Sequence, residues 1–241
     1  MQLAHLSWPE VERYLASRDT VVIPVGSTEQ HGPNGLCGTD YLTANGIALA
    51  AGEEAGILVA PPIVYGMATH HMGFAGTVTL RPSTLIALAL DVVGSLHRHG
   101  FRAFYFVNGH GGNISTLNAA FSEIHHALEG CRLRLTSWWH IAEVRKLEEE
   151  LFGERNGRHA TPSEISLTMH LEPGAVKPPG DPPEISRPRH HWPLSAEEFR
   201  ATFPDGRMAS DPSLASADYG KRLFDLCVKR VAEDLGAFAR G

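Results

Sequence analysis

Short apolar runs alternate along this chain with longer segments in which apolar residues recur every three or four positions. The runs predict strands that are buried on both faces of a sheet, and the longer segments predict helices that each bury one face. The expected strands cover residues 20–25, 57–60, 101–107 and 132–136. The expected helices cover residues 8–15, 41–55, 83–99, 114–129, 141–151, 165–171 and 218–238.

The order of these elements predicts the fold class. Strands that alternate with helices favour a parallel sheet with helices on both faces. We therefore expect an α/β/α sandwich around a mainly parallel sheet, built by residues 1–241 as a single domain. At residues 165–171 the apolar spacing fits period 2 as well as period 3.6, and Thr161 or Ser163 as an N-cap with Pro173 as a stop favours a short helix.

Two segments do not follow the alternation. Residues 63–80 mix glycines and histidines with aromatic residues, and we expect a functional loop that ends in a short strand at residues 77–80. Residues 172–193 are rich in proline, which predicts an extended, irregular excursion. A long loop of this kind in a compact domain is usually functional or an oligomer contact.

Composition narrows the class of protein. Hydrophobic residues make up 43% and charged residues 20%, as in an ordinary globular protein. The net charge of −6 provides no basic surface for nucleic acid. The chain shows no signal-peptide pattern and no apolar run near the roughly 18 residues of a membrane span. The three cysteines, Cys37, Cys131 and Cys227, are far apart and odd in number, which argues against a disulfide framework and predicts a cytoplasmic protein.

The first expected strand leads into a loop of metal-ligand residue types. Glu29, His31 and Asp40 follow the strand closely and are separated by glycines. Carboxylate oxygens beside an imidazole suit Zn²⁺, Mn²⁺ or Fe²⁺, and a carboxylate can bridge two ions. The alternative is a polar surface loop in which glycine and proline serve turn geometry and the charges are solvated.

Other loops are expected to meet this one. Residues 101–107 run directly into NGHGGN at residues 108–113, which places His110 at the carboxyl end of a strand, the usual ligand edge of a parallel sheet. Loops at residues 26–40, 63–76, 108–113 and 153–164 should share this edge. They carry the acids and imidazoles Glu29, His31, Asp40, His70, His71, His110, His159 and Glu164. So many converging ligand types predict a functional site.

Five motifs carry a resemblance to a known family. They are PVGSTEQHGPNGLCGTD at 24–40, YGMATHHMGFAGTVTL at 65–80, VNGHGGN at 107–113, HATPSEIS at 159–166 and GRMASDPSLASADYGKRL at 206–223. In these motifs and their order the chain resembles the creatininase (creatinine amidohydrolase) family of metal-dependent amidohydrolases. The first and third motifs are highly specific. The resemblance implies a creatininase-like sandwich and a metal-dependent hydrolase.

The resemblance also implies a ligand set for two divalent ions, Zn²⁺, Mn²⁺ or Fe²⁺. Asp40 would bridge them, Glu29 and His110 would hold one, and His31 with a further carboxylate would hold the other. Creatinine-hydrolysing members carry that carboxylate two residues after the histidine of the NGH motif, where this chain has Gly112. Other members use the glutamate of a later motif, which Glu164 matches here, although the residues around it are atypical. This departure argues against creatinine itself as the substrate.

The implied chemistry is hydrolysis of an amide C–N bond by a metal-bridging hydroxide. His159 matches the family's proton-shuttling histidine, with Glu164 beside it in the same motif, although a surface histidine is the alternative for His159. His71 would contact the substrate or only pack against the site. Trp138 and Trp139 could wall a flat substrate, although tryptophans after a strand more often belong to a core or a subunit interface.

Two other functions remain open at this point. NGHGGN at a helix N-terminus could bind a nucleotide or phosphate, although the motif has no P-loop lysine. A non-catalytic metal-binding subunit would keep the ligands without the proton shuttle. The family resemblance further implies a small-molecule amide as the binding partner and a homo-oligomer, commonly a hexamer. The net charge and the short apolar runs predict no nucleic acid or membrane partner.

Overall fold

Four parallel strands form the central sheet in residues 1–178 and 184–241, the ranges that this computed structural model describes. In spatial order they are β2 (Leu58–Val59), β1 (Thr20–Val25), β3 (Ala103–Asn108) and β4 (Arg132–Ser137). Each neighbouring pair is parallel. All four carboxyl ends therefore lie at the same edge of the sheet, as the sequence predicts.

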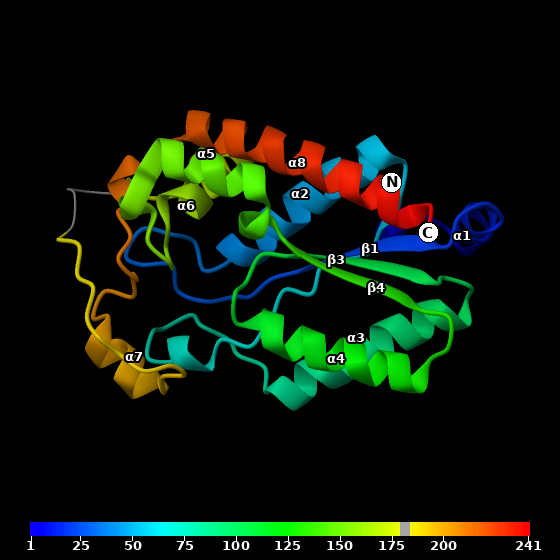
Figure 1. Cartoon of the computed structure of the whole chain (residues 1–241), viewed down its shortest axis with the longest axis horizontal. Helices are drawn as coiled ribbons and strands as arrows, with labels where there is room; N and C mark the ends of the chain where they lie inside the picture. Colours follow the sequence, from blue (N-terminus) through cyan, green and yellow to red (C-terminus); the bar gives the residue numbers. More distant parts are fainter. Residues whose placement is uncertain (179–183) are drawn as a thin grey trace.

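Helices cover both faces of the sheet, which confirms the predicted α/β/α sandwich (Figure 1). One layer contains α2 (Thr39–Ala55), α5 (Ala142–Phe152), α6 (Pro162–Leu171) and α8 (Ala217–Ala239). The opposite layer contains α3 (Pro82–Arg98) and α4 (Asn113–Ala127). The short helix α1 (Trp8–Leu15) leads into β1, and α7 (Ala196–Thr202) lies near the carboxyl edge of the sheet.

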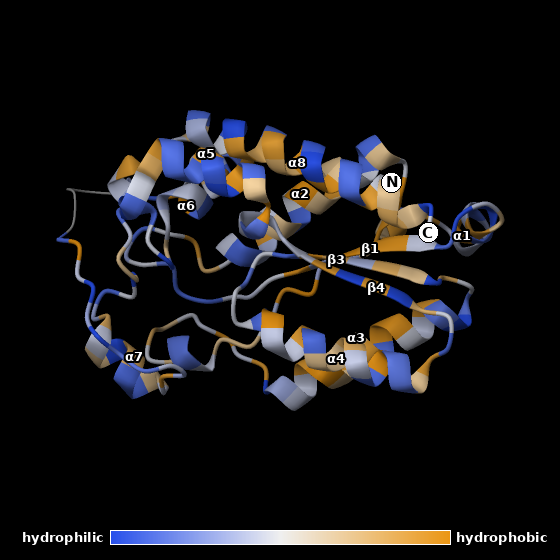
Figure 2. Ribbon diagram, in the orientation of Figure 1, coloured by the Kyte–Doolittle hydropathy of each residue, from blue (hydrophilic) through white to orange (hydrophobic). Residues whose placement is uncertain are grey.

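The apolar core is divided by the sheet into two clusters. Val22 and Tyr105 point towards α2 and α8, whereas Val21, Phe104 and Phe106 point towards α3 and α4. Successive strand residues alternate between the faces, so β1 and β3 are buried throughout and read as continuous apolar runs. Figure 2 shows the corresponding apolar stripes on the helix faces that meet the sheet.

The chain segments that leave the strands form the carboxyl edge. β1 is followed by residues 26–38 and then α2, and β3 is followed by residues 109–112 and then α4. Gly109 packs so closely on the start of α2 that a Cβ atom there would lie 2.0 Å from the Asp40 carbonyl oxygen. The absence of a side chain at this position lets the NGH turn reach the loop that carries the acidic residues.

The predicted strand at residues 77–80 is wrong. This segment forms only isolated bridges, Thr28 with Val78 and Gly66 with Thr79. Its β-branched residues serve the loops instead, because Thr79 Oγ1 accepts a hydrogen bond from Ala68 N at 2.9 Å. The second predicted strand is also shorter than expected, since pairing is confined to Leu58–Val59.

One further difference concerns the second half of the chain. Helix α7 was not expected, although a capping box formed by Ser195 and Glu198 marks its start.

Of the proline-rich excursion, residues 179–183 lie outside the described residues, and the described parts contain no helix or strand, as predicted. Within the described ranges, no helix combines the length and the apolar character that crossing a membrane would require.

Candidate metal centre

Asp40 lies between two histidines at the carboxyl edge of the sheet. Its Oδ1 atom is 3.0 Å from His31 Nε2, and its Oδ2 atom is 3.1 Å from His110 Nδ1. Asp40 occupies the first turn of α2, His31 precedes that helix, and His110 follows β3. Because β1 and β3 are neighbours in the sheet, residues far apart in sequence present ligand atoms to the two oxygens of one carboxylate.

The His110 ring is oriented by the backbone. Its Nε2 atom lies 3.0 Å from the carbonyl oxygen of Met67, and a carbonyl can only accept, so Nε2 carries the proton. The lone pair of Nδ1 then faces Asp40 Oδ2 and also Glu29 Oε1 at 3.2 Å. The other oxygen of Glu29 accepts a hydrogen bond from Ser27 Oγ at 3.0 Å. Two carboxylate oxygens and one imidazole nitrogen therefore converge here.

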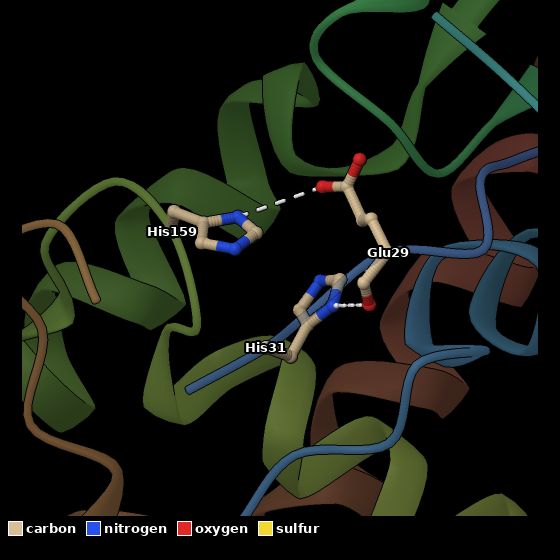
Figure 3. A group of neighbouring side chains, drawn as sticks. All are labelled: Glu29, His31 and His159. Carbon is tan, nitrogen blue, oxygen red and sulfur yellow. Dashed lines mark hydrogen bonds and ion pairs between the residues drawn. The ribbon is translucent and has the colours of Figure 1, made fainter. Parts of the chain in front are cut away.

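The His31 ring repeats this arrangement on the other side of Asp40. Its Nδ1 atom lies 3.1 Å from the carbonyl oxygen of Glu29, which fixes the proton on Nδ1 (Figure 3). The lone pair of Nε2 faces Asp40 Oδ1 and Glu164 Oε1, the latter at 3.7 Å. A metal-ligating imidazole is usually held in place in this way, with its second ring nitrogen donating a hydrogen bond to a backbone carbonyl.

The electrostatics of this cluster favour a cation. Burial on its own lowers the pKa of His31, but the carboxylates around the ring, Asp40 first and then Glu164 and Glu29, together outweigh burial and raise that pKa to about 10. Burial on its own also lowers the pKa of His110. The carboxylates of Glu29 and Asp40 together raise that pKa well above its usual range. The carboxylates thus favour a positive charge where each lone pair points, and a proton or a metal ion can supply it.

The donor set fits divalent transition metals. Glu29 Oε1, Asp40 Oδ2 and His31 Nε2 are buried and have no hydrogen-bond partner among the described residues. Two groups of three buried side chains offer ligand atoms within 4.8 Å of one another, Glu29 with Asp40 and His110, and Glu29 with His31 and His159. Imidazole nitrogens mixed with carboxylate oxygens suit Zn²⁺ and Mn²⁺. The chain therefore contains two candidate buried metal sites.

Glu164 occupies the third position of α6, where its side chain has two contacts. Its Oε1 atom accepts a hydrogen bond from Thr161 N at 2.7 Å, which closes a capping box, and the same atom faces His31. Burial raises the pKa of Glu164 to about 7. Gly112 cannot supply an alternative carboxylate, because even a Cβ atom there would lie 2.3 Å from the Met67 carbonyl oxygen.

His159 projects into the same cluster from the loop before α6 (Figure 3). Its Nε2 atom lies 2.8 Å from the Gln30 carbonyl oxygen and therefore carries the proton, so the Nδ1 lone pair faces Glu29 Oε1 at 3.8 Å. The ring centroid is 4.6 Å from that of His31. Burial, followed by the charge of His31, lowers the pKa of His159 well below its usual value. The neutral ring thus presents a free nitrogen to the site.

His71 and His70 pack around the cluster but do not line the cavity next to it. His71 Nε2 is 3.3 Å from Glu29 Oε1, and its ring is stacked at 4.2 Å on His159. His70 packs on His71 and on Phe199 of α7. Neither histidine lines the cavity next to the cluster, so the expectation that His71 contacts a substrate has no support in its position.

Gln30 is a site residue that the sequence analysis missed. Its side-chain nitrogen donates to Gly206 O at 2.9 Å and to His71 Nδ1 at 2.9 Å, which uses both of its hydrogens. Its backbone carbonyl orients His159. In the sequence, the only sign that Gln30 belongs to the site is its position between Glu29 and His31 in a loop rich in metal-ligand residue types.

A cavity of about 530 Å³ opens next to the cluster. Asp40, His110, His159 and Glu164 reach it from one side, and Trp138 and Trp139 reach it from the turn after β4. Trp138 is only 2% exposed and also belongs to the apolar core, whereas Trp139 is half-buried. The tryptophans therefore combine the two roles that the sequence left open, as cavity wall and as core.

Comparison with known proteins agrees with this architecture. The family model described as creatininase, creatinine amidohydrolase, matches residues 4–235. A creatinine amidohydrolase of Pseudomonas putida is 27% identical over 96% of this chain and 94% of its own length. A mycofactocin precursor peptide peptidase of Mycobacterium ulcerans (strain Agy99) is 31% identical over 88% of this chain and 84% of its own length.

Solved structures extend the comparison to the metals. A structure titled "Creatininase Mn" superimposes with a TM-score of 0.83 at 26% identity and covers 97% of this chain and 96% of its own. A variant creatininase described as a Zn–Zn type gives a TM-score of 0.81 at the same identity and coverage. Family model, relatives and structures agree, and this chain is an amidohydrolase of the creatininase family.

Proposed function

We propose that this protein is a dinuclear metal-dependent hydrolase that cleaves a non-peptide, possibly cyclic, amide C–N bond. The observation that carries the proposal is the position of Asp40, whose two oxygens face two different histidine lone pairs at 3.0 and 3.1 Å. A carboxylate placed in this way can bridge two cations. The backbone carbonyls behind both rings hold the unprotonated nitrogens towards it.

We assign Glu29 and His110 to one ion and His31 and Glu164 to the other, with Asp40 shared. Two divalent ions held there would supply an activated water and polarise the amide carbonyl. The protein's own contribution is to fix the ligand atoms in a buried setting, because Glu29, His31 and Asp40 are each at most 3% exposed. A water-poor site strengthens the charge stabilisation that amide hydrolysis needs.

We assign the proton transfer to His159. Its Nδ1 atom is unprotonated and faces the cluster, and its pKa is lowered, so the neutral ring can accept a proton as the nucleophile forms. The same nitrogen can return that proton to the leaving nitrogen of the amide. His71 supports the site by holding Glu29 and stacking on His159.

Creatinine is not the substrate that the chain favours, because Gly112 leaves no room for a carboxylate after the NGH motif. The cavity beside Trp138 and Trp139 suits a flat amide or ureido group. A peptide substrate is the second candidate, since one relative at 31% identity is named a peptide peptidase. A structure titled as a creatininase complexed with creatine indicates that a relative binds a small molecule.

A nucleotide or phosphate ligand at NGHGGN is less compatible with the geometry. The ring of His110 faces the carboxylates of Glu29 and Asp40, which would repel an anion placed at this turn. We also propose that the protein is a cytoplasmic homo-oligomer, as the family resemblance implies.

The test combines metal analysis with a substrate screen. Protein loaded with Zn²⁺ or Mn²⁺ should contain close to two ions per chain and should hydrolyse at least one member of a panel of cyclic amides, formamides and short peptides. Treatment with a chelator should abolish that hydrolysis, and adding back the metal should restore it. Protein that binds no metal after loading would contradict the proposal, and protein that binds two ions but cleaves none of the panel would support the non-catalytic subunit instead.

A further inference from the structure

The cavity beside the metal cluster adjoins a second, larger one. The outer cavity has a volume of about 870 Å³ and shares a stretch of wall with the inner cavity of about 530 Å³. The shared wall is formed by Arg145, Glu148, Asn156, Gly157 and Arg158. Cavities of about 300–1,000 Å³ hold drug-sized ligands, so each part alone could hold a substantial group. The two adjoining cavities are called the groove below. The groove suits a substrate that extends beyond its reacting amide.

Two arginines lie where the cavities meet. Arg145 is on α5, and Arg158 immediately precedes His159. Both side chains are exposed to the groove. Nearby arginines form ion pairs, Arg155 with Asp211 and Arg187 with Glu154, whereas Arg145 and Arg158 have no ion-pair partner within residues 1–178 and 184–241. The chain has a net charge of −6, yet two guanidinium groups with no ion-pair partner among the described residues lie at this junction, where an anionic ligand could pair with them.

The acidic residues of the groove do not cancel this charge. Glu154 is paired with Arg187 at 2.9 Å, and Glu149 lines only the outer cavity. Glu148 lines both cavities and is close enough to Arg145 for that charge to act on it, but its side chain is buried. Burial raises its pKa, although hydrogen bonds from Ser163 and Asn156 and then the charge of Arg145 oppose the shift. A substrate entering the groove therefore meets the exposed guanidinium groups in preference to the buried carboxyl.

From this arrangement we propose that Arg145 and Arg158 bind a carboxylate on the non-reacting part of the substrate. The substrate class is then an amide, formamide or cyclic ureide that bears a free acid at a distance from the scissile C–N bond. Guanidinium groups match carboxylates through paired, charge-assisted hydrogen bonds, which fix orientation as well as add affinity. This inference rests on the proposed function, because it names the substrate of the same site.

The position of Arg158 next to His159 adds a geometric argument. The backbone at this point is held by Met208, since Arg158 N donates to Met208 O at 2.8 Å and Met208 N donates to His159 O at 3.2 Å. His159 belongs to a candidate metal-ligand group, and Arg158, the residue before it, lines both cavities. An acid held by Arg158 would thus be placed at a fixed distance from the proton-transferring ring.

The experiment compares acids with neutral alcohols of the same skeleton. The probes are N-formylglycine against N-formylethanolamine, and hydantoin-5-acetic acid against 5-(2-hydroxyethyl)hydantoin, with protein loaded with Zn²⁺ or Mn²⁺. We expect kcat/KM for at least one acid to exceed that for its alcohol by about tenfold or more. Arg145→Gln and Arg158→Gln should each reduce this preference and together abolish it, with little change for the alcohol.

Arg187→Gln is the matched control. Arg187 lines the outer cavity, is already paired with Glu154, and does not line the inner cavity, so its loss should leave the acid preference unchanged. If the double variant kept the full preference, the acid would be bound by the metal ions and the inference would be wrong. Equal rates for acid and alcohol in the unaltered protein would also overturn it.

The binding measurement separates this inference from the proposed function. If none of the probes is hydrolysed, calorimetry with the same acids and alcohols on the metal-loaded protein still measures the affinity ratio. A ratio of about tenfold that disappears in the Arg145→Gln, Arg158→Gln double variant supports the carboxylate site even where catalysis has failed. No difference in affinity between acid and alcohol would contradict it.

Discussion

The Oδ1 atom of Asp40 lies 3.0 Å from the Nε2 atom of His31, and that ring carries its proton on the opposite nitrogen. A buried carboxylate that faces a bare lone pair is repelled unless a cation lies between them. The same residue faces His110 through its second oxygen, at 3.1 Å. Asp40 is therefore the group on which both halves of the proposed metal centre depend.

Replacing this carboxylate should remove the metals. We expect Asp40→Asn to lower the metal content from about two ions per chain to less than one, because the neutral amide can no longer bridge two cations. Hydrolysis should fall below detection. Elemental analysis after dialysis measures the content, and Asp91→Asn on the exposed surface of α3 is the matched control. Retention of two ions in Asp40→Asn would contradict the bridging role.

Glu164 allows one ion to be tested separately. Glu164→Gln should reduce the metal content from about two ions to about one, and the helix should persist because glutamine also closes a capping box. Glu198→Gln makes the same change in the capping box of α7 and should leave both ions in place. Two ions in Glu164→Gln would assign the second site instead to the group of Glu29, His31 and His159.

His159 should matter for turnover and not for metal binding. We expect His159→Ala to lower kcat by about 10²- to 10⁴-fold, the range typical of a lost general base, while about two ions remain bound. His159→Gln keeps a donor towards the Gln30 carbonyl but has no nitrogen that can take up a proton, so it should be as inactive. Loss of metal in both variants would show that His159 is a ligand.

The close approach of the NGH turn to α2 predicts a stability effect. Gly109→Ala places a methyl group against the Asp40 carbonyl and should lower the free energy of unfolding by about 1–3 kcal/mol. Gly111→Ala is the matched control, since a Cβ atom at Gly111 meets no heavy atom of the described residues within 4 Å. Its effect should stay within about 0.5 kcal/mol. Urea unfolding of the metal-free proteins measures both, and equal stabilities would contradict the close packing.

Much of the fold follows from local patterns. β1 and β3 are continuous apolar runs because each is buried between two helix layers, and this pattern is visible without a structure. The start of α6 at Thr161 follows from a capping box with Glu164. Residues 77–80 show the limit of such patterns, because β-branched residues favour a strand wherever they occur, while only tertiary contacts decide whether a partner strand is present.

The sequence by itself determined which residues could bind metal, since Glu29, His31, Asp40 and His110 are ligand types that follow expected strands and Glu164 lies in a motif shared with the family. Tertiary structure alone decided that β1 lies beside β3, that the two oxygens of Asp40 face two different histidines, and that His71 does not line the cavity. The physical reason is how far apart along the chain the interacting residues lie. Strand burial and helix caps depend on neighbours a few residues away, whereas ligand geometry and the groove at Arg145 and Arg158 depend on how distant segments pack.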